Sequence, residues 1–282
     1  MKERVPEASN RRIARVLEID RARLSEDQLQ ADTQEQSRTA TEVDEEIAGR
    51  IHELIKEHPT FGYRRIWALL RFGDGLVVNR KKVQRIMQLR RWQCTQRKAT
   101  PRPRVRRSRS RTNRSNERWA MDVTHINCGE DGWGHLVAIL DCHDREVVGW
   151  EFALRGRARE AERALESACL RRFGTLRPMG ETPMIRSDNG LIFQSRRFRE
   201  ACRFYRLKQE YITPYTPEQN GLVERFFRSL KEECVWQHRF ASFDEAYREI
   251  ARWIRWYNGK RPHQALGYLS PKQYQEKLRL VA

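Results

Sequence analysis

Three carboxylates are candidates for chemistry because each lies where an acidic side chain is unfavourable or needs a partner. Asp122 interrupts the strand-like stretch "WAMDVTHI", Asp188 ends an apolar stretch in "SDNG", and Glu224 lies in the helix-like stretch "QNGLVERFF". An acidic residue weakens a strand of apolar and β-branched neighbours. Sequences break local rules of this kind mainly at functional sites, so the three residues are taken together as a candidate site.

Three carboxylates in one place would repel one another and raise their pKa values unless a cation neutralised them. Oxygen ligands favour Mg²⁺ or Mn²⁺, and two such ions about 3.5–4 Å apart can activate an attacking oxygen and stabilise a leaving oxygen in phosphoryl transfer. The sequence therefore predicts a two-metal site. Taken singly, each residue also has a structural interpretation: Asp122 as a strand-end hydrogen-bond acceptor, Asp188 as a turn former and Glu224 as a solvated helix residue.

The overall charge indicates what such a site would act on. Against 38 acidic residues the chain has 56 Lys and Arg, which gives a formal charge of +18 and favours a polyanion, most often nucleic acid, as partner. The longest clean apolar run, residues 136–140, is too short to span a membrane. The N-terminus lacks a secretory signal and the cysteines are scattered, so we expect a cytoplasmic protein with reduced thiols.

An alternation of strand and helix patterns would position the carboxylates. Three strands, a helix, a strand, a helix, a strand and a helix follow one another from about residue 119. This order predicts an α/β, RNase H-like fold, a mixed five-stranded sheet with flanking helices. The expected ranges are 119–128, 133–145, 146–154, 158–173, 182–190, 196–205, 207–214 and a long helix from 217.

The helix from residue 217 has a well-marked start. Thr216 and Gln219 fit a capping box around Pro217. At 100° per residue, an apolar stripe runs along one side of this helix, and Glu224 lies at the edge of that stripe. Glu224 can therefore point across the ends of the sheet. The stripe consists of Val223, Phe226, Phe227, Leu230 and Cys234, and Asn220, Glu224, Arg228 and Lys231 lie beside it.

Helical patterns before residue 93 predict an all-helical DNA-binding domain. Apolar residues recur at helical spacing from Val43, a second helix covers residues 63–72, and Asn79 is a good N-cap for a third helix over 80–90. A helix-turn-helix would place the third helix in a major groove. A small bundle with a solvated basic face is the alternative. The expected DNA-binding residues on this helix are Arg80, Lys81, Lys82 and Arg85.

The remaining segments complete the predicted organisation. Residues 1–41 are expected to form a weakly ordered segment with one short helix, and residues 42–92 the helix-turn-helix domain. Residues 93–118 are expected to form an arginine-rich linker, which either contacts phosphates or only tethers the domains. The catalytic core covers residues 119–240. Residues 241–282 extend it with a helix opened by a Ser242–Glu245 capping box, and the loop "NGKRPHQAL" either meets DNA or closes the fold.

The three carboxylates and the sequence motifs around them resemble those of one family. Asp122, Asp188 and Glu224, with 35 residues between the last two, are similar to the D, D-35-E triad of retroviral-type integrases and bacterial insertion-sequence transposases, and Lys231 matches the family's basic position seven residues after the Glu. "SDNG", "TPYTPEQNGLVERFFRSLKEE" and "YNGKRPHQALGYLSPKQY" resemble the second-reading-frame (OrfB) transposase subunit. "HPTFGYRRIWALL" resembles the helix-turn-helix upstream of it.

The resemblance implies a Mg²⁺- or Mn²⁺-dependent polynucleotidyl transferase with two ions per site. It would cleave one strand at each element end and join the 3′-OH to another phosphodiester. The triad would bind the metals, while Lys231, Asn220 and Arg228 would position terminal DNA. The implied partners are double-stranded DNA (terminal inverted repeats and target), further copies of the chain and an upstream-reading-frame subunit, all at the bacterial nucleoid.

The sequence departs from the family pattern at two points. His52 and His58 lack a C-x-x-C pair, so the zinc module of retroviral integrases is not expected. His125 lies where these transposases commonly have Tyr, and we interpret it as a DNA-facing or packing residue. Two other functions stay open: an RNase H-like nuclease that does not join strands, and a non-enzymatic DNA-binding regulator derived from a transposase.

Overall fold

The computed structural model describes residues 44–94, 112–213 and 217–281. The chain divides into two compact units, Met1–Glu53 and Leu54–Ala282. The short helix predicted near residues 11–19, most of the basic linker and Thr216 lie outside the described residues. None of the helices in the described ranges is both long and apolar enough to cross a bilayer.

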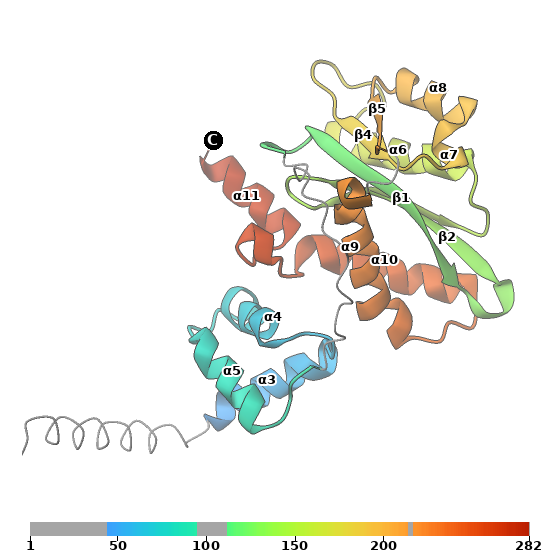
Figure 1. Ribbon diagram of the computed structural model, residues 1–282. Coiled ribbons are helices and arrows are strands. Elements are labelled where there is room, and N and C mark those ends of the chain that lie inside the picture. The colour runs from blue at the N-terminus through green and yellow to red at the C-terminus, as the bar shows by residue number, and fades with distance from the viewer. Residues whose placement is uncertain (1–43, 95–111, 214–216, 282) are drawn as a thin grey trace, which may run out of the picture. The chain divides into compact units, whose positions relative to one another are not determined.

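The N-terminal elements are helical, as predicted (Figure 1). They are α3 (Glu45–Glu57), α4 (Tyr63–Ala68), a π-helical turn η1 (Leu69–Gly73) and α5 (Arg80–Leu89). Asn79 caps α5 as predicted, because its Oδ1 accepts a hydrogen bond from the backbone N–H of Lys81 at 2.9 Å. The inward side of α5 consists of Val83, Ile86 and Met87, whereas Leu89, the last residue of the helix, is 54% exposed.

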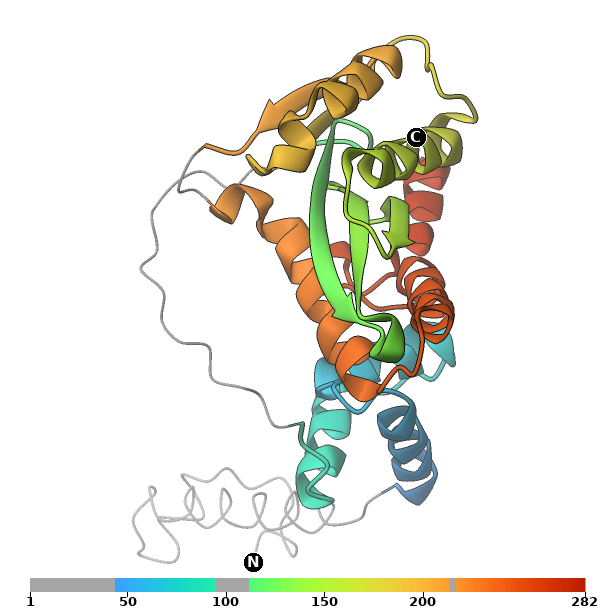
Figure 2. The same ribbon diagram turned by 90° about the vertical axis from the view of Figure 1, so that its right-hand side faces the viewer.

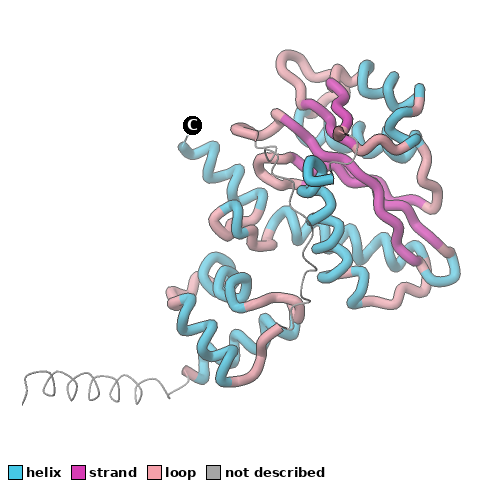
Figure 3. The backbone as a smooth tube through the Cα atoms, viewed as in Figure 1, coloured by secondary structure: helices cyan, strands magenta, loops and turns pink. Residues whose placement is uncertain are grey.

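The sheet has five strands in the order β3-β2-β1-β4-β5 (Figure 3). The first three strands are antiparallel, whereas β4 runs parallel to both β1 and β5. The predicted RNase H-like mixed sheet is therefore confirmed. The strands are β1 (Arg118–Asn127), β2 (Trp133–Asp141), β3 (Val147–Ala153), β4 (Met184–Ser187) and β5 (Lys208–Tyr211).

Helices cover both faces of the sheet, and each face has its own apolar core. Trp119 and Met121 of β1 pack into the core that contains residues of α6 and α8, while Ala120 and Ile126 pack into the core that contains residues of α9 and α10. Figure 2 shows α9 lying along β1. The helices are α6 (Ala158–Phe173), α7 (Leu191–Gln194), α8 (Arg196–Phe204), α9 (Gly221–Glu233), α10 (Phe243–Gly259) and α11 (Pro271–Val281).

Short 3₁₀ turns join several of these elements. Before α9, η3 (Pro217–Asn220) replaces the first turn of the helix that was predicted to begin at Pro217. Gln219 binds Thr213, while Thr216 of the predicted capping box lies outside the described residues. Its Oε1 accepts from the N–H of Thr213 at 2.8 Å, and its Nε2 donates to Thr213 Oγ1 at 3.2 Å. The other 3₁₀ turns are η2 (Gly129–Asp131), η4 (Val235–Gln237) and η5 (Gln264–Leu266).

The helix α10 begins as predicted. Ser242 Oγ accepts from the N–H of Glu245 at 3.3 Å, and Glu245 Oε2 accepts from the N–H of Ala241 at 2.7 Å. The helix then buries Trp253 and Tyr257 against the core on the α9 side of the sheet. This packing holds α10 in the same layer as α9, the helix that carries Glu224.

Candidate active site

The register of the parallel strands brings Asp122 and Asp188 to the same face of the sheet. Ala120 of β1 pairs with Arg186 of β4, and each Asp lies two residues further along its chain. Side chains two residues apart in an extended chain share a face. Ala120 packs in the core on the α9 side, so the face that holds Asp122 is the one that α9 covers.

Asp122 lies in a strongly negative environment. Burial, together with the nearby charges of Asp188 and Glu224, raises the pKa of this carboxyl to about 6. The N–H of Val123, which donates to Asp122 Oδ1 at 2.8 Å, and the Lys231 ammonium act in the opposite direction. The three predicted carboxylates and Lys231 are therefore close enough to influence one another electrostatically.

Asp188 is held in a tight turn. Its Oδ1 accepts from the N–H of Gly190 at 2.9 Å. A Cβ at position 190 would lie 2.9 Å from that same oxygen, so a larger residue there would require the Asp188 carboxylate to shift. The turn-former interpretation is thus correct for Asp188. It leaves the half-buried carboxylate beside Asp122, because the same turn fixes its direction.

Glu224 lies in the first turn of α9, on the exposed side of the helix. The apolar stripe of α9 is buried as predicted and consists of Val223, Phe226, Phe227 and Leu230. Lys231 is half-buried on the same helix. In the described ranges, no three His, Cys, Asp or Glu side chains are grouped closely enough to hold a metal ion. The carboxylates thus share a neighbourhood without forming a closed ligand set.

The donor set nevertheless fits a hard divalent cation. Its donors are all carboxylate oxygens, which Mg²⁺ and Mn²⁺ prefer. Burial and the charges of Asp188 and Glu224 raise the pKa of Asp122, so its ionised form needs added positive charge. A divalent ion would supply that charge and favour the ionised form of Asp122.

The other predicted DNA-binding residues lie in different environments. Asn220 is only 3% exposed, and its Nδ2 donates to the carbonyl of Met121 at 3.4 Å, so it ties the start of α9 to β1. Arg228 is exposed and pairs with Glu232 at 2.8 Å. On α5, residues Arg80, Lys81 and Lys82 are exposed and Arg85 is half-buried.

His125 is an exposed packing residue in the described structure. Its ring meets the ring of His135 edge-on, with 4.7 Å between the centroids. This contact agrees with the packing half of the interpretation made from the sequence.

Sequence reasoning missed a buried arginine beside the site. Arg186 is 6% exposed, its Nε donates to Glu210 Oε2 at 2.7 Å, and its Nη1 donates to the carbonyl of Gln219 at 3.2 Å. The available signal was its position two residues before Asp188, which places both residues on one face of the strand. A charged residue in a short buried strand is itself unusual.

The C-terminal loop "NGKRPHQAL" closes the fold, which decides between the two interpretations of this loop. Arg261 is 4% exposed and binds Glu233 of α9 through two hydrogen bonds, Nε to Oε2 at 2.7 Å and Nη2 to Oε1 at 2.6 Å. Asn258 exchanges two hydrogen bonds with the backbone of Val147, at 2.9 and 3.0 Å. The loop therefore connects the edge strand β3 to the far end of α9.

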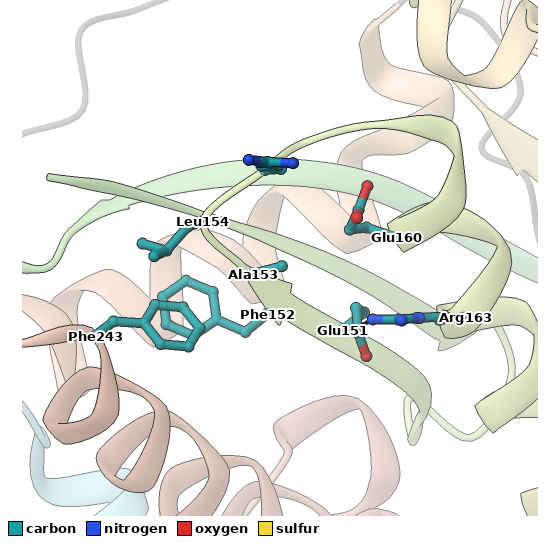
Figure 4. A pocket seen from close by; sticks show the side chains of 8 residues that line it. Glu151, Phe152, Ala153, Leu154, Glu160, Arg163 and Phe243 are labelled. Carbon is teal, nitrogen blue, oxygen red and sulfur yellow. Dashed lines mark hydrogen bonds and ion pairs between the residues drawn. The ribbon is translucent and has the colours of Figure 1, made fainter. Parts of the chain in front are cut away.

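A shallow hollow beside β3 takes no part in this site (Figure 4). Phe152 stacks on Phe243 with 4.8 Å between the ring centroids, and Arg163 pairs with Glu151 at 3.2 Å. None of the predicted catalytic residues lines the hollow. The candidate site therefore lies elsewhere, at the carboxylates carried by β1, by the turn after β4 and by α9.

Comparisons with known proteins match nearly the whole chain. Models described as "Integrase core domain" match residues 112–217 and 205–271, and a model described as "HTH-like domain" matches residues 42–100. Transposase InsD for insertion element IS2A/D/F/H/I/K of Escherichia coli is 30% identical over 269 residues, which are 93% of this chain and 89% of that protein. Transposase InsD for insertion element IS2-9 of Escherichia coli (strain K12) is also 30% identical, over 93% and 87%.

Solved structures with a similar fold include two viral proteins. The catalytic core domain of HTLV-2 integrase in complex with magnesium (trimeric form) is 21% identical, with a TM-score of 0.44, over 58% of this chain and 99% of that chain. A simian T-cell lymphotropic virus intasome in complex with PP2A regulatory subunit B56 gamma is 20% identical, with a TM-score of 0.44, over 70% and 69%. On the match to the InsD proteins and to the integrase core models, this chain belongs to the insertion-sequence transposases of the DDE/integrase superfamily.

Proposed function

We propose that this transposase cleaves one strand at each element end to free a 3′-OH and then joins that 3′-OH to another phosphodiester. The observation that carries the proposal is the environment of Asp122. Its pKa is raised to about 6 by burial and by Asp188 and Glu224, which project from two other elements. Such a concentration of carboxylates in a chain of formal charge +18 is typical of a metal-dependent phosphoryl transferase.

Each side chain has a proposed role. Asp122 and Asp188 would hold the metal ions and Glu224 would complete the second metal site. Two bound Mg²⁺ or Mn²⁺ ions would supply activation of the attacking oxygen and stabilisation of the leaving oxygen. Lys231, whose charge lowers the pKa of Asp122, is well placed to orient a DNA phosphate. Arg228 would add a backbone contact from the exposed side of α9.

DNA recognition is assigned to the helical N-terminal part. The exposed cations at the start of α5 would contact an element end in the major groove and along its backbone. The proposed domain boundaries stay those of the sequence: 42–92, 93–118, 119–240 and 241–282. The proposed partners are inverted-repeat DNA, target DNA, further copies of this chain and an upstream-reading-frame subunit.

Substitution of Glu224 by Gln tests the proposal. The variant keeps the shape of the side chain and removes the charge, so cleavage and joining of labelled element ends in Mg²⁺ should fall to background while end binding is retained. Glu232→Gln is the matched control, because Glu232 lies on the same helix and pairs with Arg228 instead of facing Asp122. It should cleave and join like the wild type.

The products distinguish the other two functions. Wild-type protein that cleaves ends without producing joined DNA would be a nuclease. A wild type that binds ends and does neither would be a regulator. Metal-dependent joining retained in the Glu224→Gln variant would refute the assignment of Glu224.

A further inference from the structure

Arg186 lies where the elements that carry the three carboxylates meet. Its neighbour Ile185 packs into the core on the α6 side, so Arg186 and Asp188 lie on the α9 side of the sheet. The side chain of Arg186 is 7% exposed. A buried charge of this kind is retained only where it is paired and hydrogen-bonded.

The partners of Arg186 join two elements to the strand that leads to Asp188. Its Nε donates to Glu210 Oε2 on β5 at 2.7 Å, and its Nη1 donates to the carbonyl of Gln219 at 3.2 Å. Arg118, at the start of β1, donates to the same Glu210 oxygen at 3.1 Å. The carbonyl of Gln219 belongs to the 3₁₀ turn that leads directly into α9.

The two hydrogen bonds of Arg186 differ in what they connect. Glu210 has a second cationic partner in Arg118, whereas the bond to Gln219 connects β4 directly to the start of α9. One planar guanidinium reaches both acceptors in fixed directions, which a lysine ammonium does not reproduce. The position of Glu224, five residues after Gln219, therefore depends on Arg186.

We propose that Arg186 is a positioning residue of the transposase, which holds the first turn of α9 so that Glu224 faces Asp122 and Asp188. The proposal rests on the function assigned above. It predicts that the loss of Arg186 displaces one metal ligand and leaves the other two on their strands. Residues that orient metal ligands typically contribute about 10–100-fold in metal affinity or activity.

Mn²⁺ binding to the full-length protein without DNA tests the proposal. Binding is measured by the loss of the free-ion electron paramagnetic resonance signal in the wild type and in Arg186→Lys, Arg186→Met and Asp122→Asn variants. We expect Arg186→Lys to weaken Mn²⁺ affinity by about 10–100-fold. High Mn²⁺ concentration should then restore strand joining in Arg186→Lys and leave Asp122→Asn inactive.

The matched control is Arg261→Lys. Arg261 is also buried and also binds α9, but at the opposite end of the helix from Glu224. Below its melting temperature, this variant should bind Mn²⁺ within about twofold of the wild type, because no metal ligand moves. Circular dichroism on every variant separates loss of fold from loss of position. If Arg186→Met does not fold, Arg186→Lys and Glu210→Gln still test the claim.

Failure of the positioning role and failure of the metal site give different results. Wild-type affinity in both Arg186→Lys and Glu210→Gln would overturn the positioning role and leave the proposed function intact. Equal and negligible Mn²⁺ binding by the wild type and Asp122→Asn would instead overturn the metal site itself, and the positioning role with it.

Discussion

The two ends of α9 are held by buried arginines in contrasting surroundings. At the C-terminal end, Arg261 and Glu233 are 4% and 5% exposed, and Arg65 adds a second cation to Glu233. At the N-terminal end, Arg186 bonds a carboxylate that is 30% exposed and a backbone carbonyl, near Asp122, whose ionised form is disfavoured by burial and by the charges of Asp188 and Glu224. The C-terminal end is built for stability, and the N-terminal end keeps carboxylates close together at a cost in stability, as functional sites do.

The difference between the two ends has a physical reason. Like charges at the N-terminal end would push α9 away from the sheet unless other contacts held the helix in place. The apolar stripe of α9 and the paired charges at its far end supply those contacts. We infer that the stable end of the helix allows the strained charge arrangement at the other end.

The largest effect on stability is expected from Arg261→Met. Loss of the guanidinium leaves Glu233 buried without its closest partner, and breaking a buried pair in this way costs about 3–5 kcal/mol. Arg65 also donates to Glu233, at 3.1 Å, but its side chain is 38% exposed, so we expect it to compensate only in part. Urea unfolding measures the loss. The double variant Arg261→Met with Glu233→Gln should recover part of it, and a single-variant loss under about 1 kcal/mol would contradict the comparison.

A smaller effect of opposite sign is expected from Asp122→Asn. The folded protein raises the pKa of Asp122 from 3.8 to about 6, so its ionised form is disfavoured in the fold. The neutral amide avoids this cost, and the metal-free variant should be about 1–2 kcal/mol more stable than the wild type at neutral pH. Thermal unfolding in a chelator measures the gain. Catalysis should be lost in the same variant.

The stability gain of Asp122→Asn should depend on pH. Above pH of about 6 the wild-type carboxyl is ionised in both the folded and the unfolded state, so the full gain of Asp122→Asn is present. The gain should shrink as the pH falls from about 6 toward 3.8, and below 3.8 the carboxyl is protonated in both states. A stability difference that does not change over this window would show that Asp122 is not the strained carboxylate.

Local patterns in the sequence predicted most of the fold. The helix at 158–173 matches α6 at both ends, and all five strands overlap their predicted ranges, because amphipathic and alternating patterns are properties of short segments. The second, fourth and fifth strands end three or four residues earlier than predicted. The four-residue helix α7 was missed, since it is too short to show a period. The π-helical turn at Leu69–Gly73 was likewise read as ordinary helix.

Residue type marked the candidate carboxylates in the sequence, whereas the residues that support them were not identified. Asp122, Asp188 and Glu224 were recognisable because acidic residues are out of place in their segments. Arg186 is one of 56 basic residues, and its partners lie 24 and 33 positions away, so its position in a short strand before Asp188 was a weak signal that did not identify those partners. Asn220 was predicted to contact DNA, but the structure buries its side chain against Met121, and that role stays a proposal.

The smallest effect on stability is expected from Arg228→Ala, on the exposed side of α9. Arg228 pairs with Glu232 at i and i+4, and its side chain is 61% exposed, so the pair contributes less than about 0.5 kcal/mol. If Arg228 contacts a DNA phosphate, the variant should still bind element ends more weakly, and the salt dependence of binding should fall by about one phosphate contact. Fluorescence anisotropy over a salt series measures both quantities. An unchanged salt slope would remove Arg228 from the proposed DNA interface and leave Lys231 as the proposed phosphate contact on α9.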